Sequence, residues 1–126
     1  MAWPLFPSYV FARFHLTELP RVLDVDGVVT IVRAGTTLLA IPDGDIDNVR
    51  RFAAAVEQYG IAPTIEPYVE VGEQVRIIDG PLRGVEGLVL EWRQGHTRVL
   101  IGLQAVGQGL SVNVGTASLQ RIEPRR

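Results

Sequence analysis

The chain has 126 residues, with twelve arginines, no lysine, fourteen acidic residues and a formal net charge of −2. That near-neutral balance excludes the strongly basic footprint of a protein held to nucleic acid mainly through phosphate contacts. The lack of cysteine excludes disulfides, thiol catalysis and thiolate zinc sites, and no apolar run approaches the ~20 residues that span a bilayer.

The first forty residues carry short apolar runs separated by turn formers. Three short strands are predicted, at residues 8–14, 28–32 and 38–41. In the first of them, alternation places Tyr9 and Phe11 on one face. A short helix is expected around residues 20–24, and Asp26-Gly27 gives a turn.

The clearest helix begins after Pro42, with Asp43 as the predicted N-cap. Asp45 and Asp47 suit the positive end of the helix dipole, and Gly60 ends the helix. Apolar residues recur at helical spacing on one face, namely Ile46, Val49, Phe52, Ala53 and Val56.

Prolines at positions 63 and 67 predict a stiff connector over residues 61–68. The predicted division is a first domain at residues 1–62, a linker at 63–69 and a second domain at 70–126. Five strands are expected in the second domain, at about 74–78, 86–92, 97–103, 110–114 and 119–122, with a hairpin turn at Gln94-Gly95. Five short strands in so few residues favour a small barrel over an open sheet.

Residues 71–90 read VGEQVRIIDGPLRGVEGLVL, with short β-branched runs broken by glycines. Gly87 lies inside the second run, where a missing side chain predicts a bend or a close backbone approach. The segment resembles a KOW motif, which is typical of SH3-like barrels in transcription and ribosomal factors.

Residues 4–14 read PLFPSYVFARF and closely resemble a segment of NusG-family N-terminal domains. The pattern continues in the same order with GVV at 27–29, VRAG at 32–35 and IPD at 41–43, which leads into the helix. With the KOW motif, the resemblance covers nearly the whole chain and is nearest to the RfaH-like and UpxY-like antiterminators of surface-polysaccharide operons.

The resemblance implies an α+β protein, in which a truncated antiparallel-sheet NusG N-terminal domain precedes a small SH3-like β-barrel of the KOW type. Family members normally carry a further strand and an amphipathic helix ahead of the PLFP segment. A sheet without them exposes an edge that invites pairing with another chain. We therefore expect a homo-oligomer formed through the truncated domain, with a shortened sequence as the competing explanation.

The resemblance also implies that Phe6, Pro7, Tyr9 and Phe11 bind RNA polymerase as apolar anchors for its clamp helices. A plain core role is the alternative for Phe6 and Tyr9. Thr17 and Arg21 follow the segment where relatives touch the polymerase gate loop or non-template DNA. A solvated loop is the simpler reading of that region.

In the barrel, four residues are expected to contact a partner or RNA: Arg83, Val85, Trp92 and Arg93. Arg83 lies in the 80–84 turn, where a plain surface charge is the alternative. Val85 stands where relatives often place an aromatic that meets Rho or the ribosomal partner NusE. Trp92 and Arg93 would form a stacking platform for a base, with the alternative that the tryptophan closes the core of the small barrel, as strand tryptophans more often do.

No catalytic constellation is found, because His15 and His96 are the only histidines and neither has an acidic cluster at ligand spacing. We expect no enzyme activity, no cofactor and no metal. Nothing in the first residues is typical of a secretory signal, so we expect a cytoplasmic protein without a membrane partner.

These observations predict a transcription elongation or antitermination factor that binds RNA polymerase through its first domain. Its KOW barrel would bind a second partner, namely a ribosomal protein such as NusE, Rho or RNA within the elongation complex. A ribosome-associated RNA-binding KOW protein and a dimeric protein-interaction module are the alternatives.

Overall fold

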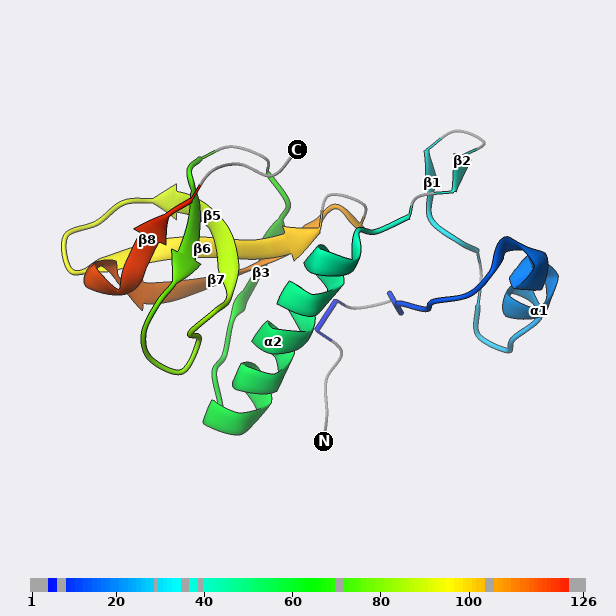
Figure 1. Ribbon diagram of the computed structural model, residues 1–126, viewed down its shortest axis with the longest axis horizontal. Helices are drawn as coiled ribbons and strands as arrows, with labels where there is room; N and C mark the ends of the chain where they lie inside the picture. The colour runs from blue at the N-terminus through cyan, green and yellow to red at the C-terminus, as the bar shows by residue number, and fades with distance from the viewer. Residues whose placement is uncertain are drawn as a thin grey trace. The chain divides into compact units, whose positions relative to one another are not determined.

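The chain divides into two compact units, Met1–Ala40 and Ile41–Arg126. The computed structural model describes residues 5–6, 9–28, 30–34, 37–38, 40–69, 72–103 and 106–122 (Figure 1). The division falls ahead of the long helix, whereas the sequence placed the boundary at residues 63–69. The helix therefore groups with the sheet that follows it.

The first unit holds little regular structure among its described residues. Its elements are the 3-10 helix η1 (Leu16–Glu18), helix α1 (Leu19–Leu23) and the strands β1 (Arg33–Ala34) and β2 (Thr37–Leu38). The two strands pair antiparallel and form a sheet of their own. The predicted short helix is confirmed, and the turn at Asp26-Gly27 is confirmed by the φ of 91° at Gly27.

The prediction of strands at residues 8–14 and 28–32 is wrong for the described residues of both segments. Of the strand predicted at residues 38–41, Leu38 lies in β2, and the described residues 40 and 41 are not strand. A strand gains its stability from the ladder of a neighbouring strand. The first segment instead begins with a turn, in which the Tyr9 N–H donates to the Phe6 carbonyl at 3.1 Å. Val10 is 92% exposed, so its apolar side chain lies open to solvent.

Helix α2 (Asp43–Tyr59) confirms the clearest sequence prediction. Its N-cap is Pro42 rather than Asp43, because the Pro42 carbonyl accepts the first bonds, from the N–H groups of Asp45 at 3.0 Å and Ile46 at 3.2 Å. Gly60 ends the helix in the left-handed region at φ 63° and ψ 33°, a conformation that costs glycine little.

The second unit contains one six-stranded antiparallel sheet with the order β3-β7-β6-β5-β4-β8. Its strands are β3 (Thr64–Pro67), β4 (Gln74–Ile77), β5 (Glu86–Glu91), β6 (His96–Leu103), β7 (Gln108–Gly115) and β8 (Leu119–Arg121). The five strands expected from the sequence are confirmed in position, as is the turn at Gln94-Gly95.

Strand β3 forms where the sequence predicted a connector, and it pairs with β7 in the register Ile65 to Leu110. The prolines that suggested a connector are compatible with this position. A strand at the edge of a sheet has one side without a ladder, so a missing N–H there costs nothing.

The core lies along strands β6 and β7, and both faces of β6 are buried at its centre. Val99 and Ile101 point to one face and Leu100 to the other, and each is at most 1% exposed. On β5, a Cβ at Gly87 would lie 2.6 Å from Val99 Cγ1 and 2.7 Å from the Leu100 carbonyl oxygen. The close backbone approach predicted at Gly87 is therefore confirmed.

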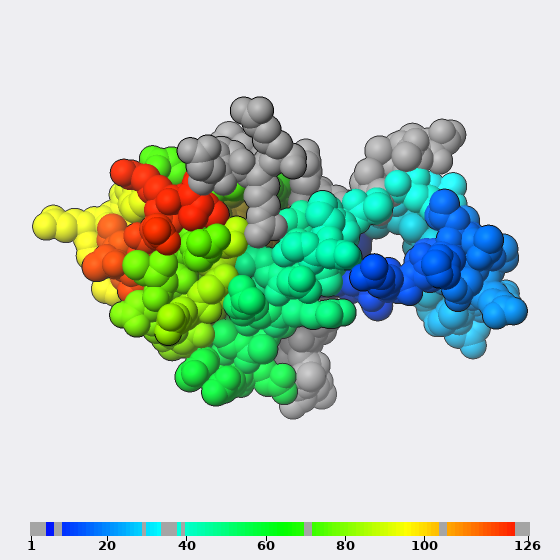
Figure 2. All heavy atoms as spheres, in the orientation of Figure 1, coloured from blue at the N-terminus to red at the C-terminus, as the bar shows by residue number. Residues whose placement is uncertain are grey.

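Helix α2 buries one face against this unit. Val49, Phe52 and Ala55 are buried at helical spacing, and Phe52 is fully covered. Figure 1 shows α2 running along one side of the sheet, and the helix contacts β6. In Figure 2 the green atoms of α2 lie directly against the yellow-green atoms of residues 80–90.

We expect Phe52→Ala to lower the free energy of unfolding by about 3–5 kcal/mol, because it leaves a cavity under the helix. Urea unfolding followed by circular dichroism measures this change. Tyr59→Ala is the matched control on the same helix, since Tyr59 is 53% exposed, and we expect it to cost less than about 1 kcal/mol. Equal losses for the two variants would contradict a buried helix face.

Candidate interaction surfaces

The front segment brings its aromatic residues together. Phe6 is 2% exposed, and its ring meets the ring of Phe11 edge-to-face, with 5.9 Å between centroids and 90° between planes. Tyr9 is half-buried and is joined to Phe6 by the backbone turn. Pro7 lies outside the described residues. The structure thus places three of the four predicted polymerase-binding residues in one local cluster.

Thr17 lies in η1 and Arg21 in α1, and both are exposed. They share a short helical segment that follows the aromatic cluster along the chain. Both side chains therefore lie on the surface, as a contact with a polymerase loop or with DNA requires.

In the sheet unit, Arg83 and Val85 differ sharply in exposure. Arg83 is exposed in the turn that its own N–H closes onto the Gly80 carbonyl at 3.1 Å. Val85 is fully buried, so it packs in the core and does not present a surface anchor. The reason is local, because the Ile77 N–H donates to the Val85 carbonyl at 2.8 Å and the Val85 N–H donates to the Leu82 carbonyl at 3.0 Å, which turns this segment inward.

Trp92 directly follows β5 and is 41% exposed, so the alternative that it closes the core is wrong. Its ring partner is Arg121 of β8, whose guanidinium carbon lies 5.0 Å from the ring centroid. Glu73 holds the same guanidinium by an ion pair of 2.6 Å. The sequence offered no signal for this cluster, because its members are far apart in the chain.

Arg93, predicted to share a platform with Trp92, instead pairs with Glu91 at 3.0 Å. The hydrogen bond and charge of Arg93 hold the pKa of the Glu91 carboxyl below its usual value. The Arg93 carbonyl accepts from the hydroxyl of Thr116 at 2.9 Å, and the Thr97 and Thr116 hydroxyl oxygens are 2.7 Å apart. Thr97 is fully buried, so this network fixes the β5–β6 turn to the segment after β7.

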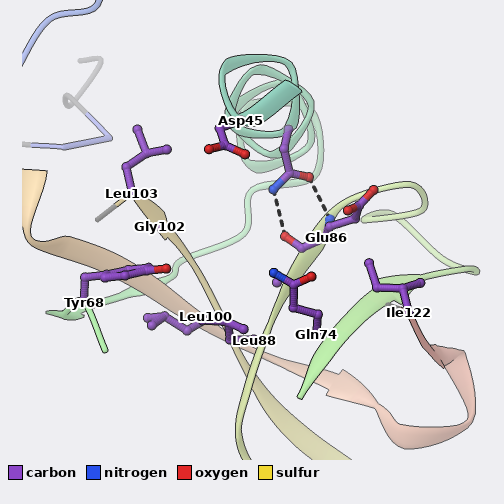
Figure 3. A pocket seen from close by; sticks show the side chains of 11 residues that line it. Asp45, Tyr68, Gln74, Glu86, Leu88, Leu100, Gly102, Leu103 and Ile122 are labelled. Atoms are coloured by element: carbon purple, nitrogen blue, oxygen red, sulfur yellow. Dashed lines mark hydrogen bonds between the residues drawn. The ribbon is translucent and has the colours of Figure 1, made fainter. Parts of the chain in front are cut away.

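Asn48 joins α2 to the sheet by two reciprocal hydrogen bonds, drawn dashed in Figure 3. Its Nδ2 donates to the Glu86 carbonyl at 2.8 Å, and the Glu86 N–H donates to its Oδ1 at 2.7 Å. One turn further along the helix, Arg51 donates to the Gly84 carbonyl at 3.0 Å.

A pocket of about 210 Å³ lies beside this contact, between α2 and the sheet. Figure 3 shows Asp45 reaching toward it from the helix, with Tyr68, Leu100 and Gln74 lining it from the sheet side. Small-molecule sites usually occupy about 300–1,000 Å³. The pocket is therefore better explained as a packing gap under the helix than as a ligand site.

Glu66 of β3 pairs with Arg98 of β6 across strand β7, which lies between them. The hydrogen bond from Arg98 is the main cause that lowers the pKa of the Glu66 carboxyl, and a hydrogen bond from Ser111 of β7 adds to it. Burial opposes the shift only in part. The edge strand β3 is thereby tied to the centre of the sheet.

Within the described part of the chain, no three His, Cys, Asp or Glu side chains are placed to hold a metal ion. No helix in that part is both long and apolar enough to cross a membrane.

Comparison with known proteins gives one recurring name, although no family model matches the chain. The chain is 26% identical over 119 residues to the transcription termination/antitermination protein NusG of Rickettsia bellii. This alignment covers 93% of the chain and 60% of that protein. NusG of Rickettsia conorii is 27% identical over 112 residues (87% and 57%), and NusG of Pseudomonas aeruginosa 26% over 125 residues (93% and 66%).

A solved structure of Thermotoga maritima NusG, described as a study of domain interaction, aligns with 20% identity and a TM-score of 0.46, covering 87% of this chain and 63% of that one. The chain spans about three fifths of the length of the two Rickettsia relatives. The chain is therefore similar to proteins named NusG over 87–93% of its length.

We expect Asn48→Ala to destabilise the sheet unit by about 1–3 kcal/mol, because it leaves the Glu86 N–H and carbonyl without the partner they have in the half-buried contact. Urea unfolding measures the loss. Gln58→Ala, an exposed position on the same helix, serves as the control and should stay within about 0.5 kcal/mol of the wild type. An Asn48 variant as stable as this control would show that the two bonds do not hold the helix.

The Glu66 carboxyl has a folded pKa below its usual value of 4.5, so its pair contributes stability above that pH and loses it as the pH falls through the folded pKa. We expect Glu66→Gln to be less stable than the wild type at neutral pH and to show a flatter decline in acid. Urea unfolding at a series of pH values gives both quantities.

Glu91→Gln is the matched control for Glu66→Gln. Glu91 also has a lowered pKa, but its side chain is 48% exposed, and water weakens such a pair. If both variants lose stability in acid with the same slope as the wild type, the Glu66–Arg98 pair does not contribute to stability in the way stated.

Proposed function

We propose that the chain acts as a NusG-type transcription termination or antitermination factor, by binding rather than by chemistry. The observation that carries this proposal is the alignment with proteins named NusG over 87–93% of the chain. The proposed setting is the cytoplasm, where transcription takes place in bacteria such as those of the relatives.

The first unit engages RNA polymerase through Phe6, Pro7, Tyr9 and Phe11. Phe11 is half-buried and is backed edge-to-face by Phe6, which is itself 2% exposed and so supports its neighbours from below. Rigid aromatic anchors of this kind suit a helix-in-groove contact. Tyr9 is only half-buried and keeps part of its ring open to a partner. Thr17 and Arg21, both exposed, contact the gate loop or non-template DNA.

The sheet unit serves as an SH3-like KOW barrel that recruits a second partner, which is the ribosomal protein NusE, Rho or RNA. The positions of its five predicted strands and the exposed turn arginine Arg83 support this role. Among NusG proteins, the PLFP and IPD segments favour a specialised RfaH-like or UpxY-like antiterminator.

In this mechanism the first unit disfavours pausing by holding the polymerase clamp closed. The shift of the clamp toward its closed state is set by the difference between the affinities of the first unit for the closed and the open clamp. Tight binding to both states would not move this equilibrium. Because both units belong to one chain, capture of the polymerase raises the effective concentration of the second partner near the emerging RNA.

We expect the tagged chain to retain core RNA polymerase in a pull-down, and Tyr9→Ala to weaken that binding at least about tenfold, as the loss of one aromatic anchor does. Biolayer interferometry gives the dissociation constants. Tyr59→Ala, a tyrosine on the other unit with 53% exposure, is the matched control and should bind like the wild type.

Retention of ribosomal RNA without retention of the polymerase would contradict the proposal and favour a ribosome-associated KOW protein. If the chain retains neither ribosomal RNA nor the polymerase, the result would favour a dimeric interaction module. Light scattering would then measure the mass of the dimer.

A further inference from the structure

Trp92, Arg121 and Glu73 form a cluster on the surface of the sheet unit that the sequence did not reveal. Trp92 is 41% exposed, the Arg121 guanidinium lies 5.0 Å from its ring centroid, and Glu73 holds that guanidinium at 2.6 Å. We infer that Trp92 and Arg121 form a stacking platform for a base of single-stranded RNA. The inference rests on the proposed function, because it names RNA as a partner of the sheet unit.

The backbone fixes the platform from both sides of β4. The Val89 N–H donates to the Glu73 carbonyl at 2.9 Å, which holds β5 beside the residues that precede β4. The Ile122 N–H donates to the Gln74 carbonyl at 3.0 Å, which holds the end of β8 on the other side. In Figure 2 the red atoms of β8 lie beside the yellow atoms of the projecting β5–β6 turn.

The surroundings of Trp92 suit a base better than the core of a protein interface. Its ring partner Arg121 is ion-paired with Glu73, and the residues directly before and after Trp92 in the chain form the Glu91–Arg93 ion pair. Interface cores are depleted in charge and built from contiguous apolar surface. A base needs only one open aromatic face and hydrogen-bond donors at its edge, and the indole and the planar guanidiniums supply both.

The same ion pairs predict how binding depends on salt. Arg121 and Arg93 are already neutralised by carboxylates, so at most these two arginines release counterions from RNA phosphates. The slope of log K against log salt should then be no steeper than about −1.4 for a single strand. Binding driven by stacking with a shallow salt dependence distinguishes the platform from an ordinary basic patch.

The test is fluorescence anisotropy of the full chain with short labelled oligouridylate and oligoadenylate strands. We expect Trp92→Ala to weaken binding about 5- to 150-fold, which is the loss of one stacked base, while Trp92→Phe keeps most of the affinity. Arg50→Ala, an exposed arginine on α2, should change nothing. Glu73→Gln frees Arg121 and should make the salt slope steeper.

A direct readout of stacking uses the background Trp3→Phe, which leaves Trp92 as the only tryptophan. Single-stranded RNA should quench its fluorescence, and a duplex, whose bases are already stacked, should not.

Equal affinities for the wild type and Trp92→Ala would overturn the inference, as would a chain that binds neither strand. Polymerase binding through Tyr9 is measured separately, so either result leaves the proposed function standing. If Trp92→Ala weakens binding to NusE or Rho and leaves RNA binding unchanged, the cluster is a protein contact and the assignment to RNA is wrong.

Discussion

The pair of hydrogen bonds between the Asn48 side chain and the Glu86 backbone determines where α2 lies on the sheet. A primary amide carries its NH2 group and its carbonyl oxygen on the same carbon, so Asn48 can donate to the Glu86 carbonyl and accept from the Glu86 N–H at the same time. The contact fixes the helix at one point, and the burial of Phe52 then follows on the same helix face. A gap of about 210 Å³ lies beside this contact.

A second polar contact has a similar role at the β3 edge of the sheet. Strand β3 is short and begins and ends near prolines, so the hydrogen bonds of its own ladder attach it only weakly to the sheet. Glu66 reaches over β7 to Arg98, which ties the edge to a central strand. Both contacts are charged or amide groups that reach across elements. Together they attach the two elements outside the compact run from β4 to β8, namely α2 and β3.

The sequence predicted the sheet well because its signals are local. Alternating apolar residues separated by glycines predicted the strands β4 to β8. The residues on either side of Gly87 were enough to predict that another backbone segment approaches it closely. The strand predicted at residues 8–14 does not form, because a strand needs a neighbouring strand to pair with. An alternating sequence alone does not provide that neighbour. Strand β3 was missed because prolines mark connectors as well as edges. The sequence could not predict which residues surround Trp92, because Arg121 and Glu73 come from distant segments of the chain.

The threonine network behind the β5–β6 turn has a consequence for any partner that meets this part of the surface. Thr97, Thr116 and the Arg93 carbonyl fix the loop before a ligand arrives. An already rigid loop loses little conformational entropy on association, so more of the contact energy survives as affinity. Preorganisation of this kind also favours a lock-and-key encounter, in which the complex forms without a slow rearrangement of the loop.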